Sequence, residues 1–265
     1  MNNLSTDTEK WAKELEVAKG IAYEAGEIMR KYFDGDQQLE KKEDGSPVTI
    51  ADKEINSMVI KSLSEKFPED GVVGEEESTA EYGEGRRWIC DPIDGTWAFI
   101  TGVPTCMFSL ALVEDGVPVV GVAYDPFLDR LYYATIHSGA YCNDTKIYVS
   151  DRKLEDGVIA IADSLSKIRK SKFSYLDNIL SRNLKTVPLN GAVYKGCLVA
   201  TGRLVGYLSE YINTHDVAAA HLITEEAGGK VTSFSGDKLD YKKSFKGAVF
   251  SNKVTHQDIL DLLKD

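Results

Sequence analysis

Four apolar, strand-like segments lie in the first half of the chain, between parts whose apolar spacing is helical. They cover residues 87–90, 107–113, 117–124 and 130–135. The second and third are joined by Asp115-Gly116, a dipeptide that favours the tight turn of a β-hairpin. An antiparallel sheet is therefore expected in this half.

Two helices are expected before this sheet. Apolar residues recur at helical spacing in residues 9–33. Thr6 and Glu9 form a capping box at the start of this helix, and Asp34-Gly35 stops it. A second helix is expected from about residue 50 to 67, with Pro68 after its end. The polar turn between them, residues 41–47, suits a substrate-facing loop, and equally a plain solvated turn.

The pattern changes around residues 150–157, and helices and strands alternate beyond it. We expect one structural unit with two subdomains. Residues 1–150 carry the helix pair, the antiparallel sheet and the main metal site, and residues 151–265 form an α/β part that completes the site. The expected elements of the second part are strands at 158–162 and 204–209, helices at 172–181, from Gly191 and at 216–227, two further strands and a closing helix.

The net charge limits the classes of molecule that the protein is expected to bind. Lys and Arg number 31 against 42 Asp and Glu, a net charge of -11, so the overall field repels nucleic acid and anionic membranes. The four cysteines lie far apart, without the close pairing of a zinc or redox motif. The N-terminus has no apolar signal core and the best apolar run, residues 103–113, is too short to span a bilayer, so a cytoplasmic location is expected.

Three acidic clusters stand where elements begin or end. In Gly74-Glu75-Glu76-Glu77, adjacent acids repel one another unless a cation offsets them, so a metal ligand is one interpretation and a solvated turn the other. In Thr214-His215-Asp216, the acid lies in a first helical turn, where it suits either a cap or a metal.

The second cluster, Asp91-Pro92-Ile93-Asp94-Gly95-Thr96, is the most specific. We expect a strand to end at Asp91 and a helix to start near Gly95, so that both aspartates face one point beside backbone N–H groups. Carboxylates beside such donors suit a phosphate bridged by Mg²⁺, which prefers oxygen ligands.

Together the three clusters resemble the inositol monophosphatase superfamily in order and spacing over nearly the whole chain. The matching motifs are Gly74-Glu75-Glu76, Asp91 through Thr96, and His215-Asp216-Val217-Ala218-Ala219 with Ala227-Gly228-Gly229. The resemblance implies an αβαβα sandwich, a layered α/β fold. It also implies a Mg²⁺-dependent, lithium-sensitive phosphatase that forms a homodimer and acts on a small phosphorylated metabolite.

Site residues are implied in the same way. Two to three Mg²⁺ ions would be held by Glu75, Asp91, the Ile93 carbonyl, Asp94 and Asp216. The attacking water would be held by metal and by Thr96, whose hydroxyl is hydrogen-bonded to Asp52. The phosphate would rest on the Gly95 and Thr96 amides, opposite the helix start at Gly191 and Ala192.

Two departures from the family pattern concern the substrate. The family usually has Trp where this chain has His215, which either reaches substrate or fills the tryptophan's place. The position of a hydroxyl-binding glutamate in inositol-hydrolysing members is Ser209 here, with Glu210 beside it and expected to point the other way. Inositol 1-phosphate is the first substrate candidate. Histidinol phosphate and adenosine 3',5'-bisphosphate are alternatives, because Lys41, Lys42 and residues 45–49 resemble those of members that use these esters as well as inositol phosphates.

Two rival interpretations stay open. An aspartyl-phosphate phosphatase would place one residue between its two aspartates, whereas two residues separate Asp91 from Asp94. A metal- or phosphate-binding regulator would keep the fold without the activity.

Overall fold

The computed structural model describes residues 10–35, 37–42, 45–161 and 175–264. The two expected N-terminal helices are α2 (Ala12–Phe33) and α3 (Ile50–Lys66), and a short hairpin of β1 (Glu40–Lys41) and β2 (Pro47–Val48) lies between them. Thr49 and Asp52 form a capping box at the start of α3. The capping box expected at Thr6 and Glu9 lies outside the described residues.

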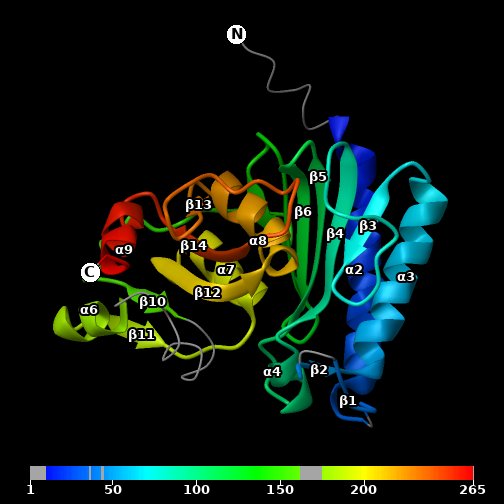
Figure 1. Cartoon of the computed structure of the whole chain (residues 1–265), viewed down its shortest axis with the longest axis horizontal. Coiled ribbons are helices and arrows are strands. Elements are labelled where there is room, and N and C mark those ends of the chain that lie inside the picture. The colour runs from blue at the N-terminus through cyan, green and yellow to red at the C-terminus, as the bar shows by residue number, and fades with distance from the viewer. Residues whose placement is uncertain (1–9, 36, 43–44, 162–174, 265) are drawn as a thin grey trace.

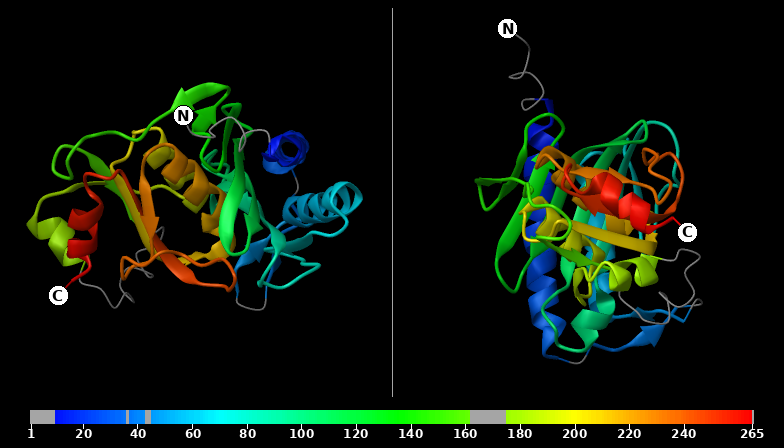
Figure 2. Two further views of the ribbon diagram at one scale, coloured as in Figure 1. Left: turned by 90° about the horizontal axis from the view of Figure 1, so that it is seen from above. Right: turned by 90° about the vertical axis from the view of Figure 1, so that its left-hand side faces the viewer.

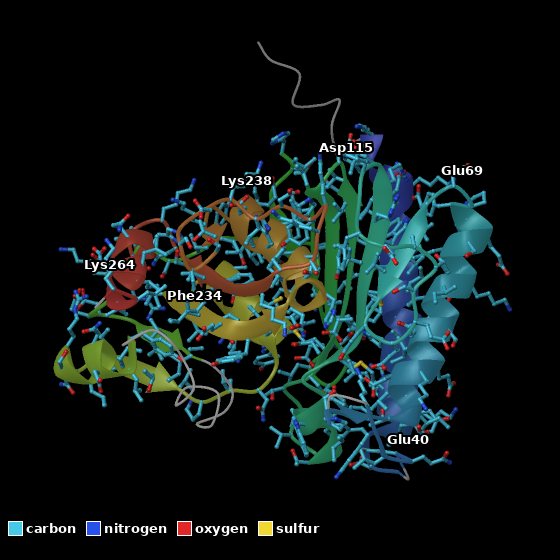
Figure 3. All side chains as sticks on the ribbon, in the orientation of Figure 1. Glu40, Glu69, Asp115, Phe234, Lys238 and Lys264 are labelled. Carbon is cyan, nitrogen blue, oxygen red and sulfur yellow. The ribbon has the colours of Figure 1, made fainter. Side chains whose placement is uncertain are left out.

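The large sheet has seven strands in the order β3-β4-β5-β6-β7-β8-β9. Only β3 and β4 pair in parallel, so the antiparallel sheet expected from the sequence is confirmed. Asp115 and Gly116, both with positive φ, form the tight turn between β5 and β6, at the end of the sheet where Figure 3 labels Asp115. The strands are β3 (Gly71–Gly74), β4 (Arg86–Asp94), β5 (Met107–Glu114), β6 (Val117–Asp125), β7 (Arg130–Thr135), β8 (Ala140–Cys142) and β9 (Thr145–Ile147).

The small sheet has five strands in the order β11-β10-β12-β14-β13. Among the described residues, four helices accompany it or connect to it, and α4 follows β4 in the first half. The elements are α4 (Thr96–Ile100), β10 (Val158–Ala160), α6 (Tyr175–Ser181), β11 (Lys185–Val187), α7 (Ala192–Ala200), β12 (Gly206–Asn213), α8 (Thr214–Glu226), β13 (Lys230–Thr232), β14 (Lys246–Ser251) and α9 (His256–Leu262).

The elements stack in five layers (Figure 1). Helices α2 and α3 cover one face of the large sheet, α7 and α8 lie between the two sheets, and α6 and α9 cover the small sheet. Seen from above in Figure 2, the α2–α3 layer and the α6–α9 layer lie at opposite ends of the molecule. Helix α8 contacts strands of both sheets, and its buried alanines, Ala218, Ala219 and Ala220, allow this close approach. The expected αβαβα sandwich is confirmed.

Several boundaries differ from those expected. β4 continues through Asp94 instead of ending near Asp91, because Asp91 and Asp94 still pair with β5 across a register shift. β12 runs past Ser209 to Asn213, also across a register shift. The apolar pattern does not indicate this extension, because polar residues interrupt it. The short strands β8, β9 and β11 were not expected because three residues carry little periodicity.

The chain passes from the large sheet to the small one between β9 and β10, and the subdomain division at residue 150 stays a prediction. In the described part of the chain, no helix combines the length and apolar character needed to cross a lipid bilayer.

Candidate active site

The site is built around the turn that links β4 to α4. A register shift between Asp91 and Asp94 interrupts the end of β4, and Gly95 follows with φ 85°, a left-handed conformation that glycine adopts without strain. Helix α4 then begins at Thr96. The expected helix start near Gly95 is therefore confirmed, whereas the expected end of the strand at Asp91 is wrong.

Four acids and one histidine converge on this turn, from the end of β3, from β4 and from the start of α8. Ligand atoms of Asp91, Asp94 and Asp216 lie within 4.8 Å of one another, and so do those of Glu75, Asp91 and His215. Asp91 belongs to both groups. The structure therefore brings together Glu75, Asp91, Asp94 and Asp216, the four predicted carboxylate ligands.

Asp91 has the character of a cation ligand. Its side chain is 1% exposed, and neither Oδ1 nor Oδ2 has a hydrogen-bond partner among the described residues. A buried carboxylate without partners is costly unless a cation or a proton neutralises it. The possible ligands are mostly carboxylate oxygens, which suit a hard divalent ion. Because Asp91 belongs to both groups of ligands, the arrangement also suits two neighbouring ions that share this carboxylate.

The pKa values of Asp91 and Asp94 also favour a bound cation. Burial raises the pKa of Asp91 well above its usual range, and Glu75, Asp216 and Asp94 raise it further by repulsion. Burial and the nearby Asp216 raise the pKa of Asp94 to about 7, against the opposing hydrogen bonds of α7. A divalent cation would favour the ionised forms of both groups.

Glu75 behaves differently from the aspartates. Burial alone would raise the pKa of Glu75, but His215 and Lys42 outweigh it and lower this pKa. Lys42 Nζ lies 2.6 Å from Glu75 Oε1 and 2.6 Å from Glu76 Oε1, so one lysine bridges two of the three adjacent acids. The acidic cluster 75–77 is therefore not a plain solvated turn.

Asp94 joins the turn to the second sheet layer. Its Oδ1 accepts a hydrogen bond from Ala192 N at 2.7 Å, and its Oδ2 accepts one from Val193 N at 2.8 Å. Gly191, the N-cap of α7, has φ 82° and lies against Asp94 and Thr105. The helix start at 190–192 thus does face the Asp91–Thr96 turn, but the Ala192 amide is bonded to Asp94 in this structure.

Asp216 caps α8 and also lies beside the other carboxylates. It forms a capping box with Asn213 at the start of α8, where its Oδ2 accepts a hydrogen bond from Asn213 N at 2.5 Å. The same carboxylate faces Asp91 and Asp94. A capping contact uses one oxygen and leaves the carboxylate able to bind a cation.

Asp52 and Thr96 do not form the hydrogen bond that was expected between them. Asp52 Oδ2 accepts from Thr49 Oγ1 at 2.6 Å, and the Thr96 hydroxyl donates to the Ile93 carbonyl at 3.3 Å. Asp52 Oδ1 is buried and has no partner in the described part of the chain. Burial raises the pKa of Asp52 to about 7 although the bonds from Thr49 lower it, so this carboxyl can hold or release a proton near neutrality.

An open cavity of about 570 Å³ lies over the turn. It is lined by Glu75, Asp94, Asp216 and the predicted phosphate contacts, Gly95, Thr96, Gly191 and Ala192. Ser209 does not line it. This residue is 2% exposed and its hydroxyl accepts from Tyr211 N at 3.3 Å, because the register shift in β12 carries Tyr211, Ile212 and Asn213 to the cavity instead.

Lys195 was missed from the sequence. Its side chain is fully buried in α7, its Nζ donates to the Leu189 carbonyl at 3.2 Å, and it lies 4.5 Å from the centre of the Tyr207 ring. Burial lowers the pKa of Lys195 to about 8 against the raising effect of Asp94 and Asp216. A lysine inside the otherwise apolar run 192–200 was the available signal, since such a side chain is rarely buried without an anionic neighbour.

Comparison with known proteins agrees with this architecture. The model of the inositol monophosphatase family matches residues 10–265. The chain is 33% identical to the fructose-1,6-bisphosphatase/inositol-1-monophosphatase of Thermotoga maritima, covering 82% of each chain. It is 34% identical to the histidinol-phosphatase of Chlorobaculum parvum, covering 84% of this chain and 86% of the relative.

A solved structure shares the fold over most of its length. The IMPase of Thermotoga maritima superposes with a TM-score of 0.85 at 30% identity, covering 94% of this chain and 96% of that one. This is a family of metal-dependent phosphatases, and the acidic cluster described above is placed to bind metal. The chain belongs to the inositol monophosphatase family.

Proposed function

We propose that this protein is a Mg²⁺-dependent phosphatase whose substrate is inositol 1-phosphate. The observation that carries the proposal is the position of Asp91, buried without hydrogen-bond partners between two groups of potential ligands. A carboxylate held in this way is stabilised by cations on both sides. Two to three ions would be held by Glu75, Asp91, the Ile93 carbonyl, Asp94 and Asp216.

When bound, Mg²⁺ supplies positive charge for the phosphate oxygens and lowers the pKa of a water molecule toward neutrality. The protein's own groups then position the reactants. The Gly95 and Thr96 amides lie at the start of α4, where N–H groups are free of helical partners and suit a phosphate. The opening of the cavity leaves the rest of the substrate outside the carboxylate cluster.

Asp52 and Thr96 are the proposed positioning groups for the attacking water. The unpartnered Asp52 Oδ1 offers an acceptor, and the raised pKa of Asp52 suits a group that exchanges a proton near neutral pH. The Thr96 hydroxyl would have to leave the Ile93 carbonyl to meet it. Direct attack by water requires no covalent phosphoenzyme.

Histidinol phosphate is the second candidate substrate. The similarity to the histidinol-phosphatase of Chlorobaculum parvum favours it, and so does His215, which can contact a substrate in the neighbouring cavity. Inositol 1-phosphate stays first because the similarity to the fructose-1,6-bisphosphatase/inositol-1-monophosphatase covers 82% of the chain, close to the 84% for the histidinol-phosphatase, and a solved IMPase shares the fold.

The test is a panel of phosphate monoesters with purified protein and Mg²⁺. It contains inositol 1-phosphate, histidinol phosphate, fructose 1,6-bisphosphate and adenosine 3',5'-bisphosphate, and Asp91→Asn is the inactive control. The highest kcat/KM is expected for inositol 1-phosphate, and a higher value for another ester would reassign the substrate. If no ester releases phosphate while Mg²⁺ binding is intact, the proposed enzymatic activity is wrong and a regulatory role is supported.

The homodimer and lithium inhibition are proposed from the family. Sedimentation velocity would test the first, and phosphate release with added Li⁺ would test the second.

A further inference from the structure

His215 lies where the family pattern has tryptophan, in the first turn of α8 and next to Asp216. Its side chain is 15% exposed. A ring nitrogen of His215 and carboxylate oxygens of Glu75 and Asp91 all lie within 4.8 Å of one another. Two ligands of one ion, each about 2.0–2.2 Å from it, lie at most about 4.4 Å apart, so atoms within 4.8 Å of one another need only a small side-chain movement to share an ion. The arrangement therefore fits a metal with one nitrogen and two oxygen ligands.

Two observations favour coordination over simple packing. Asp91, which is buried, has no hydrogen-bond partner among the described residues and belongs to this group of three. The nearest ion-pair partner of the imidazole, Asp216 Oδ1, is 3.7 Å from His215 Nε2, which is too far for a hydrogen bond. The imidazole thus faces the carboxylates without a short contact to Asp216.

The group is also accessible. A cavity of about 520 Å³ is lined by Lys42, Glu75 and His215, so an ion can reach two of the three ligands, Glu75 and His215, from solvent. Lys42 Nζ now pairs with Glu75 Oε1 at 2.6 Å, so an incoming ion would share Glu75 with the lysine or displace it. A mobile lysine head group on a flexible stem allows either arrangement.

We propose that His215 is a metal ligand, and that Glu75, Asp91 and His215 form a mixed nitrogen–oxygen site that prefers a borderline transition ion such as Co²⁺ or Zn²⁺. The group of Asp91, Asp94 and Asp216 offers only oxygen and suits Mg²⁺. Imidazole suits Zn²⁺ and its neighbours, whereas Mg²⁺ gains little from a nitrogen ligand. This inference rests on the metal site of the proposed function and deepens it, since the two halves of the site would differ in ion preference.

The test compares metal binding by the metal-free protein and three variants. His215→Trp introduces the residue of the family pattern, and His215→Gln keeps a polar side chain without an imidazole. His137→Asn is the control, because His137 is exposed, has a positive φ that asparagine tolerates, and lines a different cavity. Binding of Co²⁺ and of Mg²⁺ is measured by isothermal titration calorimetry, and bound Co²⁺ by its visible absorption.

Both His215 variants are expected to lose at least about 10-fold in Co²⁺ affinity, since even an outer partner of a metal ligand contributes about that much. Their Mg²⁺ affinity and that of His137→Asn should stay near the wild-type value. Unchanged Co²⁺ binding in both His215 variants would overturn the proposal, and so would an equal loss of Mg²⁺ and Co²⁺.

Pulsed electron paramagnetic resonance of bound Mn²⁺ gives a second measurement that needs no variant. A coupling to an imidazole ¹⁴N is expected in the wild-type protein, and its absence at full occupancy would overturn the assignment. Asp91→Asn separates the two proposals. If it abolishes metal binding while the His215 variants behave as wild type, only the role of His215 is wrong. If it binds both ions normally, the metal site of the proposed function is wrong.

Discussion

Asp94 Oδ1 accepts a hydrogen bond from the backbone N–H of Ala192 at 2.7 Å, across 98 positions of the sequence. The bond joins the last residue of β4 to the first residue of α7, so the large sheet and the layer between the sheets meet at the site. The same carboxylate is grouped with Asp91 and Asp216. Asp94 therefore combines a capping role with a proposed role in metal binding.

Replacing Asp94 by Asn should abolish turnover in a folded protein. Asn offers one acceptor oxygen, so it can keep a bond to α7 but cannot supply an anionic ligand. We expect kcat to fall at least about 100-fold, beyond the loss caused by removing an outer partner of a metal ligand. Circular dichroism should be unchanged, and Mg²⁺ should no longer raise the Tm. Wild-type activity in this variant would contradict the proposed role.

Gly191→Ala should be far more damaging than Gly102→Ala. Both glycines have positive φ, so either alanine costs about 1–2 kcal/mol of stability for its left-handed backbone. A Cβ at Gly191 would also lie 2.5 Å from the Thr105 carbonyl and 2.9 Å from Asp94 Oδ2, whereas nothing lies within 4 Å at Gly102. We expect Gly191→Ala to lose a further ~1–3 kcal/mol in urea unfolding and most of its activity. Equal unfolding midpoints would contradict this view of the α7 start.

The fold was largely predictable because its long elements carry clear periodicity. The 22-residue helix α2 and the eight- and nine-residue strands β5 and β6 repeat their apolar positions often enough to be found. The short strands were not predicted. The predicted end of β12 came too early, because the last residues of this strand are polar and follow a register shift. The layer order came from the resemblance and not from these patterns.

The site was predictable where a side chain's role follows from its own segment. Asp91 and Asp94 lie at the end of one strand, and the structure adds Glu75 and Asp216 from β3–β4 and α8 as the resemblance implied. Tertiary contacts could not be predicted in this way. The pairing of Thr96 with Ile93, the burial of Ser209 and the position of Lys195 against Tyr207 depend on register shifts and on packing between layers.

The stability of the metal-free protein should fall as pH rises through neutrality. The pKa values of Asp52 and Asp94 are raised to about 7 from the ordinary 3.8, so the folded state binds protons more tightly than the unfolded state. Their contribution to stability is therefore complete below about pH 4 and is lost as pH rises through about 7. In EDTA, the Tm should decrease between about pH 5.5 and 8.

Saturating Mg²⁺ should flatten this decrease, because a bound cation stabilises the ionised carboxylates. Titration of Mg²⁺ near pH 7 in two buffers of different ionisation enthalpy should reveal proton release. The variant Asp94→Asn should show a shallower pH dependence in EDTA. A Tm that does not change with pH in metal-free wild-type protein would contradict the raised pKa values.

Lys42→Met should tighten Mg²⁺ binding while weakening the metal-free protein. Burial alone would lower the pKa of Lys42, but Glu75 and Glu76 raise it, which means that the ammonium is held by both acids. Without it, Glu75 and Glu76 face each other uncompensated, and stability in EDTA should drop by about 1 kcal/mol, a value discounted for partial exposure. The same ammonium competes with a cation for Glu75, so its removal should lower the Mg²⁺ dissociation constant about 5-fold.

Lys41→Met is the matched control. Lys41 is exposed on β1, and its substitution removes the same formal charge one residue away from Lys42. Calorimetric titration of both variants at equal ionic strength separates the local effect from a change in net charge. A tighter Kd in Lys42→Met alone would identify Lys42 as a competitor for the metal ligand. Weaker Mg²⁺ binding in Lys42→Met would mean that the lysine orients Glu75 for the ion instead of competing with it.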